Sequence, residues 1–394
     1  MDKVKILFLG NGSPENGGCE AITKGSIEIL HRTIPDAVFF DCYFDYTGNN
    51  KINREKNIYP IHFPKKWTIK WTLWKLCSLF SNKLVAYLLY STHENIIKNA
   101  DIVLSLGGDT YSLDYGEPSR FIALGEFVKK YQKPFCIWGA SVGPFIRGSR
   151  TEKKMIKHFT EDVDLIFVRE EESKEYLESI GISKNVILTA DPAFLMKPEC
   201  CELKIPTLPE QYVCLNFSDL MAKYVTDGDI ELWKKICISI CNNLLKETSL
   251  SLVYIPHVES DYGFMVSIID YIEDPSRIIL IDHSFNAAEL KWVISKSICN
   301  IACRTHSTIA SFSMGIPTLS LGYSIKSKGL NLQMYGNYDF LVYQKDITPN
   351  NVITTFKKII ANEKLIRSQL QNRAIEIKSL ALNAGTVIKE YFKI

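Results

Sequence analysis

The chain lacks any apolar run that could cross a membrane, because no stretch approaches the ~20 consecutive apolar residues that a spanning helix needs. It also lacks a charge excess, since 46 basic and 44 acidic residues give a net charge of +2, which argues against nucleic acid as a partner. The 11 cysteines include no Cys-x-x-Cys pair, and the first residues lead into a strand-like segment instead of a signal peptide. We therefore expect a cytoplasmic protein with buried free thiols.

With 394 residues, the chain is long enough for two domains with separate cores. Short apolar runs alternate with segments of helical periodicity, from "VKILFLG" near the start to "PTLSLGY" in the second half. This alternation predicts an α/β protein with parallel sheets covered by helices. A polar stretch with prolines separates two such series, so we predict a Rossmann-like domain over 1–197 and another over 212–350. Helices over 351–394 can cross back to the first domain.

Glycines and polar residues collect where the predicted strands end. One such residue is often only part of a turn, but here the pattern recurs in both halves of the chain. Carboxyl ends of parallel strands form the ligand-binding edge of open α/β sheets, so two Rossmann-like halves predict an interdomain cleft lined by these residues. In the second half they are Asn216, His257, Arg304 and His306.

A set of short segments, taken together and in order, resembles the polysaccharide pyruvyl transferase family. The resemblance covers about residues 5–330 and has two departures: Cys19 stands where an acidic residue is common, and Thr305 where leucine is usual. The segments are "NGGCEAI", "LSLGGD", "GASVGP", "REEES", "DPAFLM", "RTHS" and "GIPTLSLGYSIK".

Membership of that family would imply a fold similar to GT-B glycosyltransferases. It would also imply phosphoenolpyruvate as the donor and a pyruvate ketal on two hydroxyls of a sugar as the product, in capsule or exopolysaccharide assembly. No metal and no organic cofactor is implied. We expect a saccharide acceptor, carried on a lipid.

Phosphoenolpyruvate carries a carboxylate and a phosphate, and arginine binds both anions in a bidentate manner. We expect Arg169 and Arg304 to hold the donor, although a salt bridge with Glu170 or Glu172 would also explain Arg169. Further donor-binding residues, partly implied by the resemblance, are Thr305, His306, Ser307 and Lys326.

Ketal formation also needs a proton for the methylene carbon of the donor, and His306 is the expected acid. It lies at the start of a predicted helix, whose dipole disfavours an imidazolium, whereas a bound trianion favours one. The alternative is a structural histidine that caps the turn. Lys326 is expected to neutralise the leaving phosphate, with Lys328 as a competitor for that role.

Residues of the first half, together with one histidine of the second, are expected to bind the acceptor. Glycines at a strand end let a substrate approach the backbone, and a carboxylate or imidazole can position sugar hydroxyls or act as a base. The expected acceptor-binding residues are Asn16, Gly107, Gly108, Asp109, Ser141 and His257.

The segment over 64–90 is basic and rich in tryptophan, and no acidic residue occurs over 56–93. A helix there would carry tryptophans on one stripe and Ile69, Leu76 and Phe80 on the other. It is either a helix buried on both sides, a dimer contact, or a surface segment that binds the inner face of the cell membrane. The expected membrane contacts are Trp67, Trp71, Trp74, Lys66 and Lys70.

Two other functions fit the same residues. One is a GT-B glycosyltransferase that uses a nucleotide sugar, with Arg304 and Lys326 on its diphosphate. The other is a sugar- or anion-binding protein without catalysis. The sequence leaves the oligomeric state open.

Overall fold

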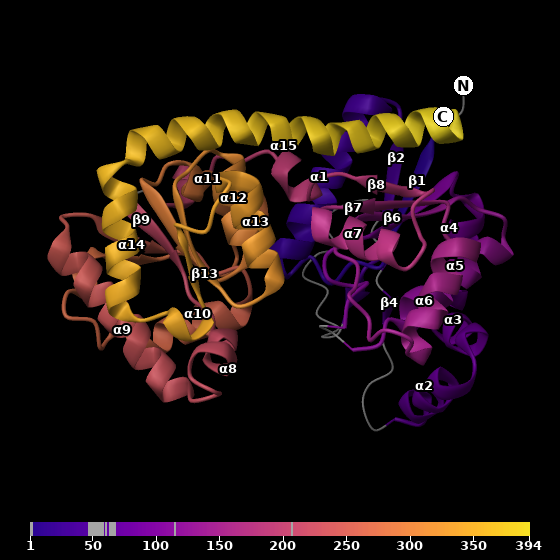
Figure 1. Cartoon of the computed structure of the whole chain (residues 1–394), viewed down its shortest axis with the longest axis horizontal. Helices are drawn as coiled ribbons and strands as arrows, with labels where there is room; N and C mark the ends of the chain where they lie inside the picture. Colours follow the sequence, from indigo (N-terminus) through magenta and orange to yellow (C-terminus); the bar gives the residue numbers. More distant parts are fainter. Residues whose placement is uncertain (1–2, 46–58, 60, 63–67, 114–115, 206–207) are drawn as a thin grey trace. The chain divides into compact units, whose positions relative to one another are not determined.

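The computed structural model describes residues 3–45, 59, 61–62, 68–113, 116–205 and 208–394 (Figure 1). The chain divides into two compact units. The main border falls at Pro192/Ala193, where the sequence placed it near 197. Unit 1 comprises Met1–Pro14, Ile22–Pro192 and Leu380–Ile394, and unit 2 comprises Glu15–Ala21 and Ala193–Ser379.

Unit 1 is built around a parallel six-stranded sheet in the order β2-β1-β5-β6-β7-β8. Every residue of β5 and β6 is buried, as expected for a parallel sheet with both faces covered. A short parallel pair, β3 (Phe44–Asp45) and β4 (Ile61–His62), lies apart from it. The strands of the main sheet are β1 (Lys5–Leu9), β2 (Val38–Asp41), β5 (Ile102–Leu106), β6 (Phe135–Ala140), β7 (Leu165–Val168) and β8 (Val186–Leu188).

Helices of unit 1 connect these strands and bury an aromatic-rich core. Tyr111 packs against Phe121 and Phe159 there, and its hydroxyl donates to Ser105 Oγ at 2.9 Å. The helices are α1 (Gly17–Thr33), whose first turn belongs to unit 2, α2 (Ile69–Phe80), α3 (Asn82–Tyr90), α4 (Glu94–Asn99), α5 (Ser119–Lys130), α6 (Arg150–Glu161) and α7 (Glu171–Ser179).

Unit 2 contains a second parallel six-stranded sheet, in the order β11-β10-β9-β12-β13-β14. Counted from its own first strand, this is the 3-2-1-4-5-6 order of dinucleotide-binding folds, in which the winding direction reverses between the first and fourth strands. Here that switch point lies between β9 and β12. The strands are β9 (Tyr212–Asn216), β10 (Ser251–Tyr254), β11 (Ile278–Leu280), β12 (Cys299–Ala302), β13 (Thr318–Gly322) and β14 (Leu341–Tyr343).

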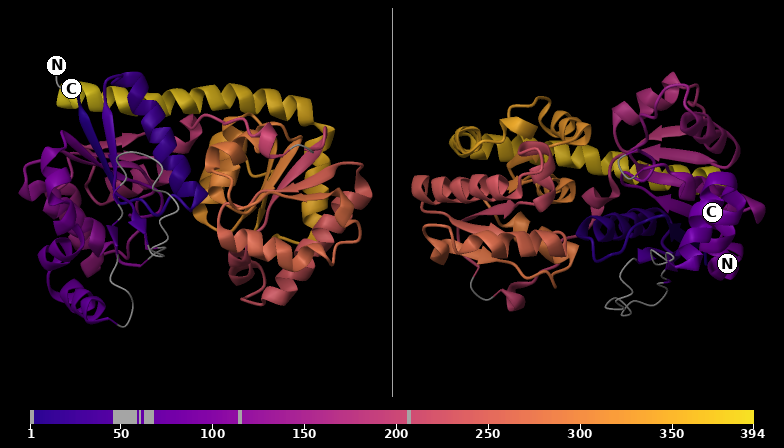
Figure 2. Two further views of the ribbon diagram at one scale, coloured as in Figure 1. Left: turned by 180° about the vertical axis from the view of Figure 1, so that it is seen from behind. Right: turned by 90° about the horizontal axis from the view of Figure 1, so that it is seen from below.

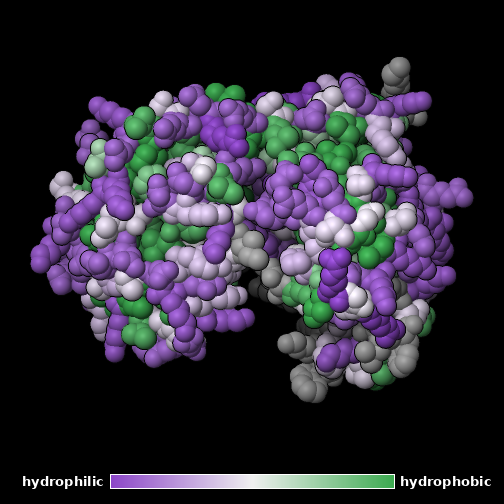
Figure 3. Space-filling model, in the orientation of Figure 1, coloured by the Kyte–Doolittle hydropathy of each residue, from purple (hydrophilic) through white to green (hydrophobic). Residues whose placement is uncertain are grey.

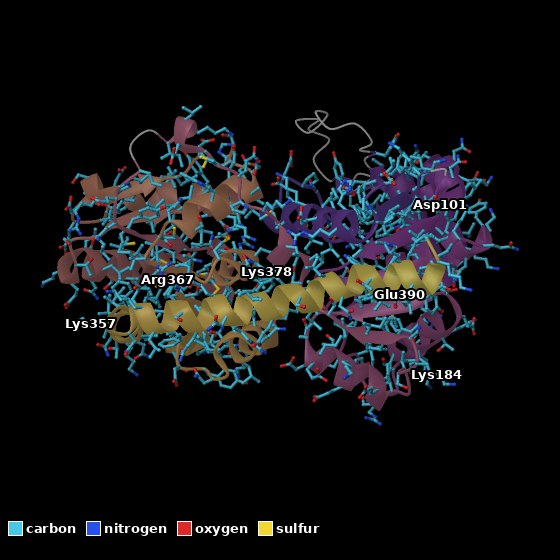
Figure 4. The ribbon with its side chains drawn as sticks, turned by 90° about the horizontal axis from the view of Figure 1, so that it is seen from above. Asp101, Lys184, Lys357, Arg367, Lys378 and Glu390 are labelled. Atoms are coloured by element: carbon cyan, nitrogen blue, oxygen red, sulfur yellow. The ribbon has the colours of Figure 1, made fainter. Side chains whose placement is uncertain are left out.

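The helices of unit 2 lie on both faces of its sheet (Figure 2). The last helix, α15, is continuous and passes from unit 2 into unit 1, with Arg367 and Lys378 on its unit 2 part and Glu390 on its unit 1 part (Figure 4). The helices are α8 (Ala222–Val225), α9 (Ile230–Glu247), α10 (Glu259–Ile269), α11 (Ala287–Ser295), α12 (Thr305–Ser313), α13 (Ile325–Tyr335), α14 (Pro349–Ala361) and α15 (Glu363–Phe392).

The sequence prediction of parallel α/β units is confirmed by these two sheets. All 11 cysteines are free thiols, and most of them are buried in the two cores, where burial raises the pKa of the thiol, to about 12 for Cys241. Such thiols are poor nucleophiles. The surface is mainly hydrophilic, with hydrophobic side chains in scattered groups on the face that Figure 3 shows.

Candidate functional site

Arg304 of unit 2 is held by a fully buried carboxylate. Its Nη2 donates to Asp261 Oδ1 at 2.7 Å, and its Nε lies 3.2 Å from both carboxylate oxygens. Burial opposes the charge on Arg304, but Asp261 outweighs it and raises the pKa of the guanidinium. The side chain remains 23% exposed, and its Nη1 makes no hydrogen bond to the described part of the chain. Arg304 is therefore both fixed in place and still able to donate to a ligand.

The backbone of Arg304 is fixed at the switch point of the unit 2 sheet. Asn216, the last residue of β9, accepts from the Arg304 N–H at 2.9 Å and donates to the Ile255 carbonyl at 2.8 Å. Asn216 is fully buried, so one amide ties together the ends of three neighbouring segments. This is where ligands bind in open parallel sheets.

Helix α12 begins directly after Arg304, with Thr305 and His306 as its first two residues. The N-cap residue makes no side-chain cap hydrogen bond, so the positive end of the helix dipole is not neutralised by its own cap. Ser307 is fully buried, and its side chain lies 3.3 Å from Asn300 Nδ2 in a polar network of the core. The contact with the donor substrate that the sequence predicts for Ser307 can therefore come only from its backbone N–H.

His257 is a buried histidine beside this helix start. Its backbone N–H donates to Asp261 at 3.2 Å, but Nδ1 and Nε2 of its ring have no hydrogen-bond partner in the described residues. Burial, followed by the nearby charges of His306 and Arg304, lowers the pKa of His257 to about 3. The imidazole is therefore neutral at ordinary pH. An unpartnered polar group in a buried position is costly, which points to a ligand at this place.

The glycine-rich loop of residues 15–21 belongs to unit 2 and packs on these histidines. The Gly17 N–H donates to the His257 carbonyl at 2.9 Å. A Cβ atom on Gly18 would lie 2.4 Å from His306 Nδ1, and one on Gly17 would lie 3.2 Å from His257 Nδ1. These two glycines are needed because the backbone approaches both rings closely.

The polar residues of that loop serve its own structure. Asn16 accepts from the Gly18 N–H at 2.9 Å through its side chain, and its carbonyl accepts from Glu20 at 3.0 Å. Glu20 accepts from the Ala287 N–H at 2.8 Å, at the start of α11. A carboxylate is thus present at position 20, directly after Cys19, which stands where an acidic residue is common in the family. The acceptor-binding role of Asn16 stays a prediction.

Lys326 lies in the first turn of α13, after β13, and is partly buried. Lys328 is exposed, with its Nζ 4.3 Å from the centre of the Tyr343 ring. Between α12 and α13 is a cavity of only about 10 Å³ with Thr305 in its lining, which is room for one water at most.

In unit 1, Arg169 follows β7 and is surrounded by carboxylates. Its Nη1 pairs with Asp191 at 2.5 Å, its Nη2 with Asp109 at 2.7 Å, and its Nε lies 3.3 Å from Glu170. The side chain is 5% exposed. Burial opposes the charge, but the three carboxylates outweigh it and raise the pKa of Arg169. The salt bridge with Glu170 that the sequence left open is present, and Arg169 is the centre of an acidic cluster.

The remaining residues around Arg169 lock the strand ends of unit 1. Ser141 accepts from Arg169 Nε at 2.9 Å, so this predicted acceptor residue is buried against the arginine. Ser173 donates to Glu170 at 2.8 Å and accepts from the Val142 N–H at 2.8 Å. The "REEES" segment therefore has a structural explanation, because it ties α7 to the loop after β6.

Gly107 and Gly108 are glycines for backbone reasons. A Cβ on Gly107 would lie 2.5 Å from Ala140 Cα, so the close approach of two strand ends excludes a side chain. Gly108 has φ +136°, which side chains rarely allow. Asp109 next to them is brought to Arg169. The predicted substrate contacts of these residues stay predictions.

Sequence reasoning missed one residue that organises the candidate site, Asp261, which holds Arg304 and His257 in unit 2. In unit 1, Asp191 of the "DPAFLM" segment holds Arg169. Asp261 lies four residues after His257, in the first turn of α10. An acidic residue one turn beyond a strand-end histidine was the available signal.

The tryptophan-rich segment has a different orientation from the predicted one. Trp74 is partly buried against the core of unit 1, and Trp71 is partly buried with Lys75 Nζ 4.6 Å from its ring. The exposed apolar side chains of α2 are instead Ile69, at 82%, and Leu73 and Leu76, which are about half exposed. Lys66 and Trp67 lie outside the described residues.

Unit 2 therefore presents a guanidinium, two imidazoles and a helix start around one glycine-rich loop. Such a set can bind a small dianion or trianion, and one imidazole can pass a proton to it. Among the described residues, no group of three or more His, Cys, Asp or Glu side chains is arranged to hold a metal ion.

Comparison with known proteins gives two kinds of relatives. The family model "Polysaccharide pyruvyl transferase" matches residues 16–325. The amylovoran biosynthesis protein AmsJ of Erwinia amylovora is 24% identical, with 97% of this chain and 98% of AmsJ covered.

Solved structures resemble the chain in fold. A putative UDP-N-acetylglucosamine 2-epimerase from Listeria monocytogenes has a TM-score of 0.66 at 14% identity, covering 99% of this chain and 97% of the other. Medicago truncatula UGT71G1, solved with UDP-glucose, has a TM-score of 0.64 at 10% identity, covering 99% and 98%. The GT-B-like architecture expected from the sequence is confirmed by these neighbours.

Proposed function

The chain belongs to the polysaccharide pyruvyl transferase family, and on that premise we propose that it moves the pyruvyl unit of phosphoenolpyruvate onto two hydroxyls of a sugar. Phosphate is released, and the acceptor is a saccharide carried on a lipid during exopolysaccharide or capsule assembly. The family and the amylovoran relative place the chain among transferases of polysaccharide biosynthesis. The identity of the donor, phosphoenolpyruvate, and that of the acceptor, a lipid-linked saccharide, are what we propose beyond this.

The observation that carries the proposal is the cluster of Arg304, His306 and His257 at the switch point of unit 2. Phosphoenolpyruvate has two anionic groups on a three-carbon frame. The Nη1 of Arg304 and the first N–H groups of α12 are donors suited to them. Asp261 fixes the orientation of the guanidinium, so little is lost in ordering it when the donor binds.

His306 is the proton donor in this proposal. It gives a proton to the methylene carbon, which leaves a cationic centre at the carbon that bears the phosphate. A sugar hydroxyl attacks that carbon and its proton restores His306. The carbon–oxygen bond to phosphate then breaks, and the second hydroxyl closes the ring while its proton leaves with the phosphate. One pyruvate ketal and one inorganic phosphate result.

The neighbouring His257 has a different role. Its lowered pKa, about 3, keeps it neutral, so it does not compete with His306 as the acid. A neutral ring next to the reacting centre can accept a hydrogen bond from a sugar hydroxyl or donate one to phosphoenolpyruvate. Lys326 is proposed to neutralise the leaving phosphate. Arg169 is surrounded by three carboxylates, and its contact with phosphoenolpyruvate stays a prediction.

The test measures phosphate release from phosphoenolpyruvate with lipid-linked galactose and mannosamine saccharides, together with product mass. Wild type is compared with His306→Gln and with His283→Gln, whose target is an exposed histidine of unit 2 beside Asp282. We expect release that depends on the acceptor and a mass gain of one ketal. His306→Gln should lose at least a hundredfold in rate, within the usual contribution of a general acid, and His283→Gln should match wild type.

Donor binding is measured separately by calorimetry, with UDP-N-acetylglucosamine as the comparison ligand. Phosphoenolpyruvate should bind without acceptor, and the nucleotide sugar should not. Binding of the nucleotide sugar alone would replace the proposal with a glycosyltransferase. Binding of phosphoenolpyruvate with full activity in His306→Gln would remove His306 as the acid.

A further inference from the structure

Helices α2 and α3 of unit 1 carry apolar side chains on both of their faces. In α3, Val85, Ala86 and Leu89 are buried, while Leu84 and Tyr87 are 53% and 61% exposed. In α2, Trp74 packs on the core, while Ile69 is 82% exposed and Leu73 and Leu76 about half exposed. A helix that is apolar all round lacks a partner for one face. Within the part of unit 1 that the structure describes, the outer faces of α2 and α3 therefore have no partner.

Cations and no anions accompany this outer face. The exposed lysines of the two helices are Lys70, Lys75 and Lys83, and neither helix contains an acidic residue. The sequence has no acidic residue anywhere over 57–93. An ordinary exposed helix carries charges of both signs. A face with only apolar and positively charged side chains instead favours a partner that is apolar and bordered by negative charge.

We propose that the outer face of α2 and α3, formed by Ile69, Leu73, Leu76, Leu84, Tyr87 and Leu88 and bordered by the exposed lysines of the two helices, binds the surface of an anionic lipid bilayer. The apolar side chains enter the boundary between headgroups and acyl chains, and the lysines lie at the lipid phosphates. A second copy of this chain fits less well, because two such faces would bring the positively charged lysines of both copies together. The proposal does not depend on the proposed reaction.

The geometry favours attachment at the surface. Helix α2 has 12 residues, which extend about 18 Å and fall short of the ~20 residues that cross a bilayer. No helix in the described ranges is long and apolar enough to span a membrane. The N-cap Thr68 accepts from the Trp71 N–H at 3.2 Å, so α2 starts with its own cap and does not need insertion to satisfy that end.

The experiment is sedimentation of the full chain with vesicles of phosphatidylcholine, alone or mixed with phosphatidylglycerol. We expect binding only to the mixed vesicles, weakened by salt. The variant Ile69→Ser/Leu73→Ser removes two exposed side chains and should weaken binding at least tenfold. The matched control is Ile375→Ser/Leu365→Ser, which removes the same residue types from exposed positions of α15 and should leave binding unchanged.

A second pair of variants tests the charges. Lys70→Gln/Lys75→Gln/Lys83→Gln should weaken binding by about fivefold per lysine. The control Lys153→Gln/Lys235→Gln/Lys358→Gln removes the same net charge from exposed positions elsewhere and should have little effect. Absence of binding by wild type overturns the proposal, as does equal loss in test and control variants. A concentration-dependent dimer that Ile69→Ser/Leu73→Ser dissociates, without vesicle binding, would assign the face to a second copy instead.

Discussion

Arg169 and Arg304 occupy similar places in the two units, since each follows a parallel strand and is held by a buried aspartate. Their surroundings differ in charge. Arg169 pairs with three carboxylates and is 5% exposed, whereas among the described residues Arg304 forms an ion pair with Asp261 alone and is 23% exposed. In unit 1 the carboxylates outnumber the guanidinium, so the positive charge of Arg169 is neutralised by its own neighbours. In unit 2 the charges balance, and the guanidinium retains an unused nitrogen for a ligand.

The same contrast extends to the neighbours of each arginine. Ser141 and Ser173 in unit 1 complete a closed hydrogen-bond network. In unit 2, His257 lies beside Arg304 with both ring nitrogens unpartnered among the described residues. A closed network stabilises a fold, and an open one is ready to bind. We infer that unit 1 uses its arginine chiefly for stability and unit 2 uses its arginine for the donor.

The largest expected effect is the loss of stability in Arg169→Met. Removal of the cation leaves three carboxylates together in a buried place, and breaking a buried ion pair in this way costs about 3–5 kcal/mol. Urea denaturation followed by tryptophan fluorescence measures it. Adding Asp191→Asn should rescue little, because Asp109 and Glu170 remain. An unfolding midpoint close to wild type would show that the cluster is not the support of unit 1.

The second prediction concerns Arg304→Met/Asp261→Asn, which removes both charges of the unit 2 pair. Without the partner substitution, the fully buried Asp261 would be left as an unpaired charge. The double variant should therefore be more stable than Arg304→Met alone, in contrast to unit 1. Phosphoenolpyruvate binding should still weaken by about 10- to 150-fold, the worth of one charged hydrogen bond. Calorimetry on both variants separates the two effects, and undiminished binding would remove Arg304 from the donor site.

The third prediction uses pH, to which the two units respond with opposite sign. Burial lowers the folded pKa of His257 from 6.5 to about 3, so only the unfolded chain binds that proton within this window. The stability of unit 2 should fall as pH drops from 6.5 towards 3, by up to about 1.4 kcal/mol per pH unit. In unit 1, burial raises the pKa of Glu170. The contribution of Glu170 to the free energy of unfolding is therefore lost as pH rises.

The variant His257→Gln cannot titrate and should flatten the acid side of the stability curve. Urea midpoints at pH 7, 6 and 5 make the comparison, with His283→Gln as the control at an exposed position. Equal slopes for wild type and His257→Gln would mean that His257 already has an ordinary pKa in the folded protein, and that the site around it is open to water.

The sequence predicted most strands of the two sheets, because they are continuous apolar runs, but not the short edge strand β14. Such runs, for example "DIVLSLGG", have one structural solution in a chain where helical segments alternate with them. Strand-end residues were also predictable, because a polar residue that ends an apolar run must lie at the sheet edge. Arg304 and His306 were found in this way.

What the sequence could not supply was the partner of each polar group. Asp261 reaches Arg304 across 43 positions, and nothing local marks that pairing. The glycine-rich loop was assigned to the first domain by its position, yet its contacts with His257 and His306 place it in unit 2. For α2, the tryptophan stripe and the Ile69 stripe are both apolar, so periodicity alone could not choose the buried face.

The smallest expected effect comes from Gly18→Ala, which tests whether that loop positions His306. Alanine suits the helix start of α1, but its Cβ would lie 2.4 Å from His306 Nδ1, so the ring must move. Moving a side chain off its preferred rotamer costs about 0.5–1.5 kcal/mol, and we expect the rate of ketal formation to fall about three- to tenfold with the fold intact. The control is Gly263→Ala in α10, where nothing lies within 4 Å of the new Cβ and the rate should not change. A full rate in Gly18→Ala would show that the place of His306 is set by α12 alone, and equal losses in both variants would point to helix stability instead of the histidine.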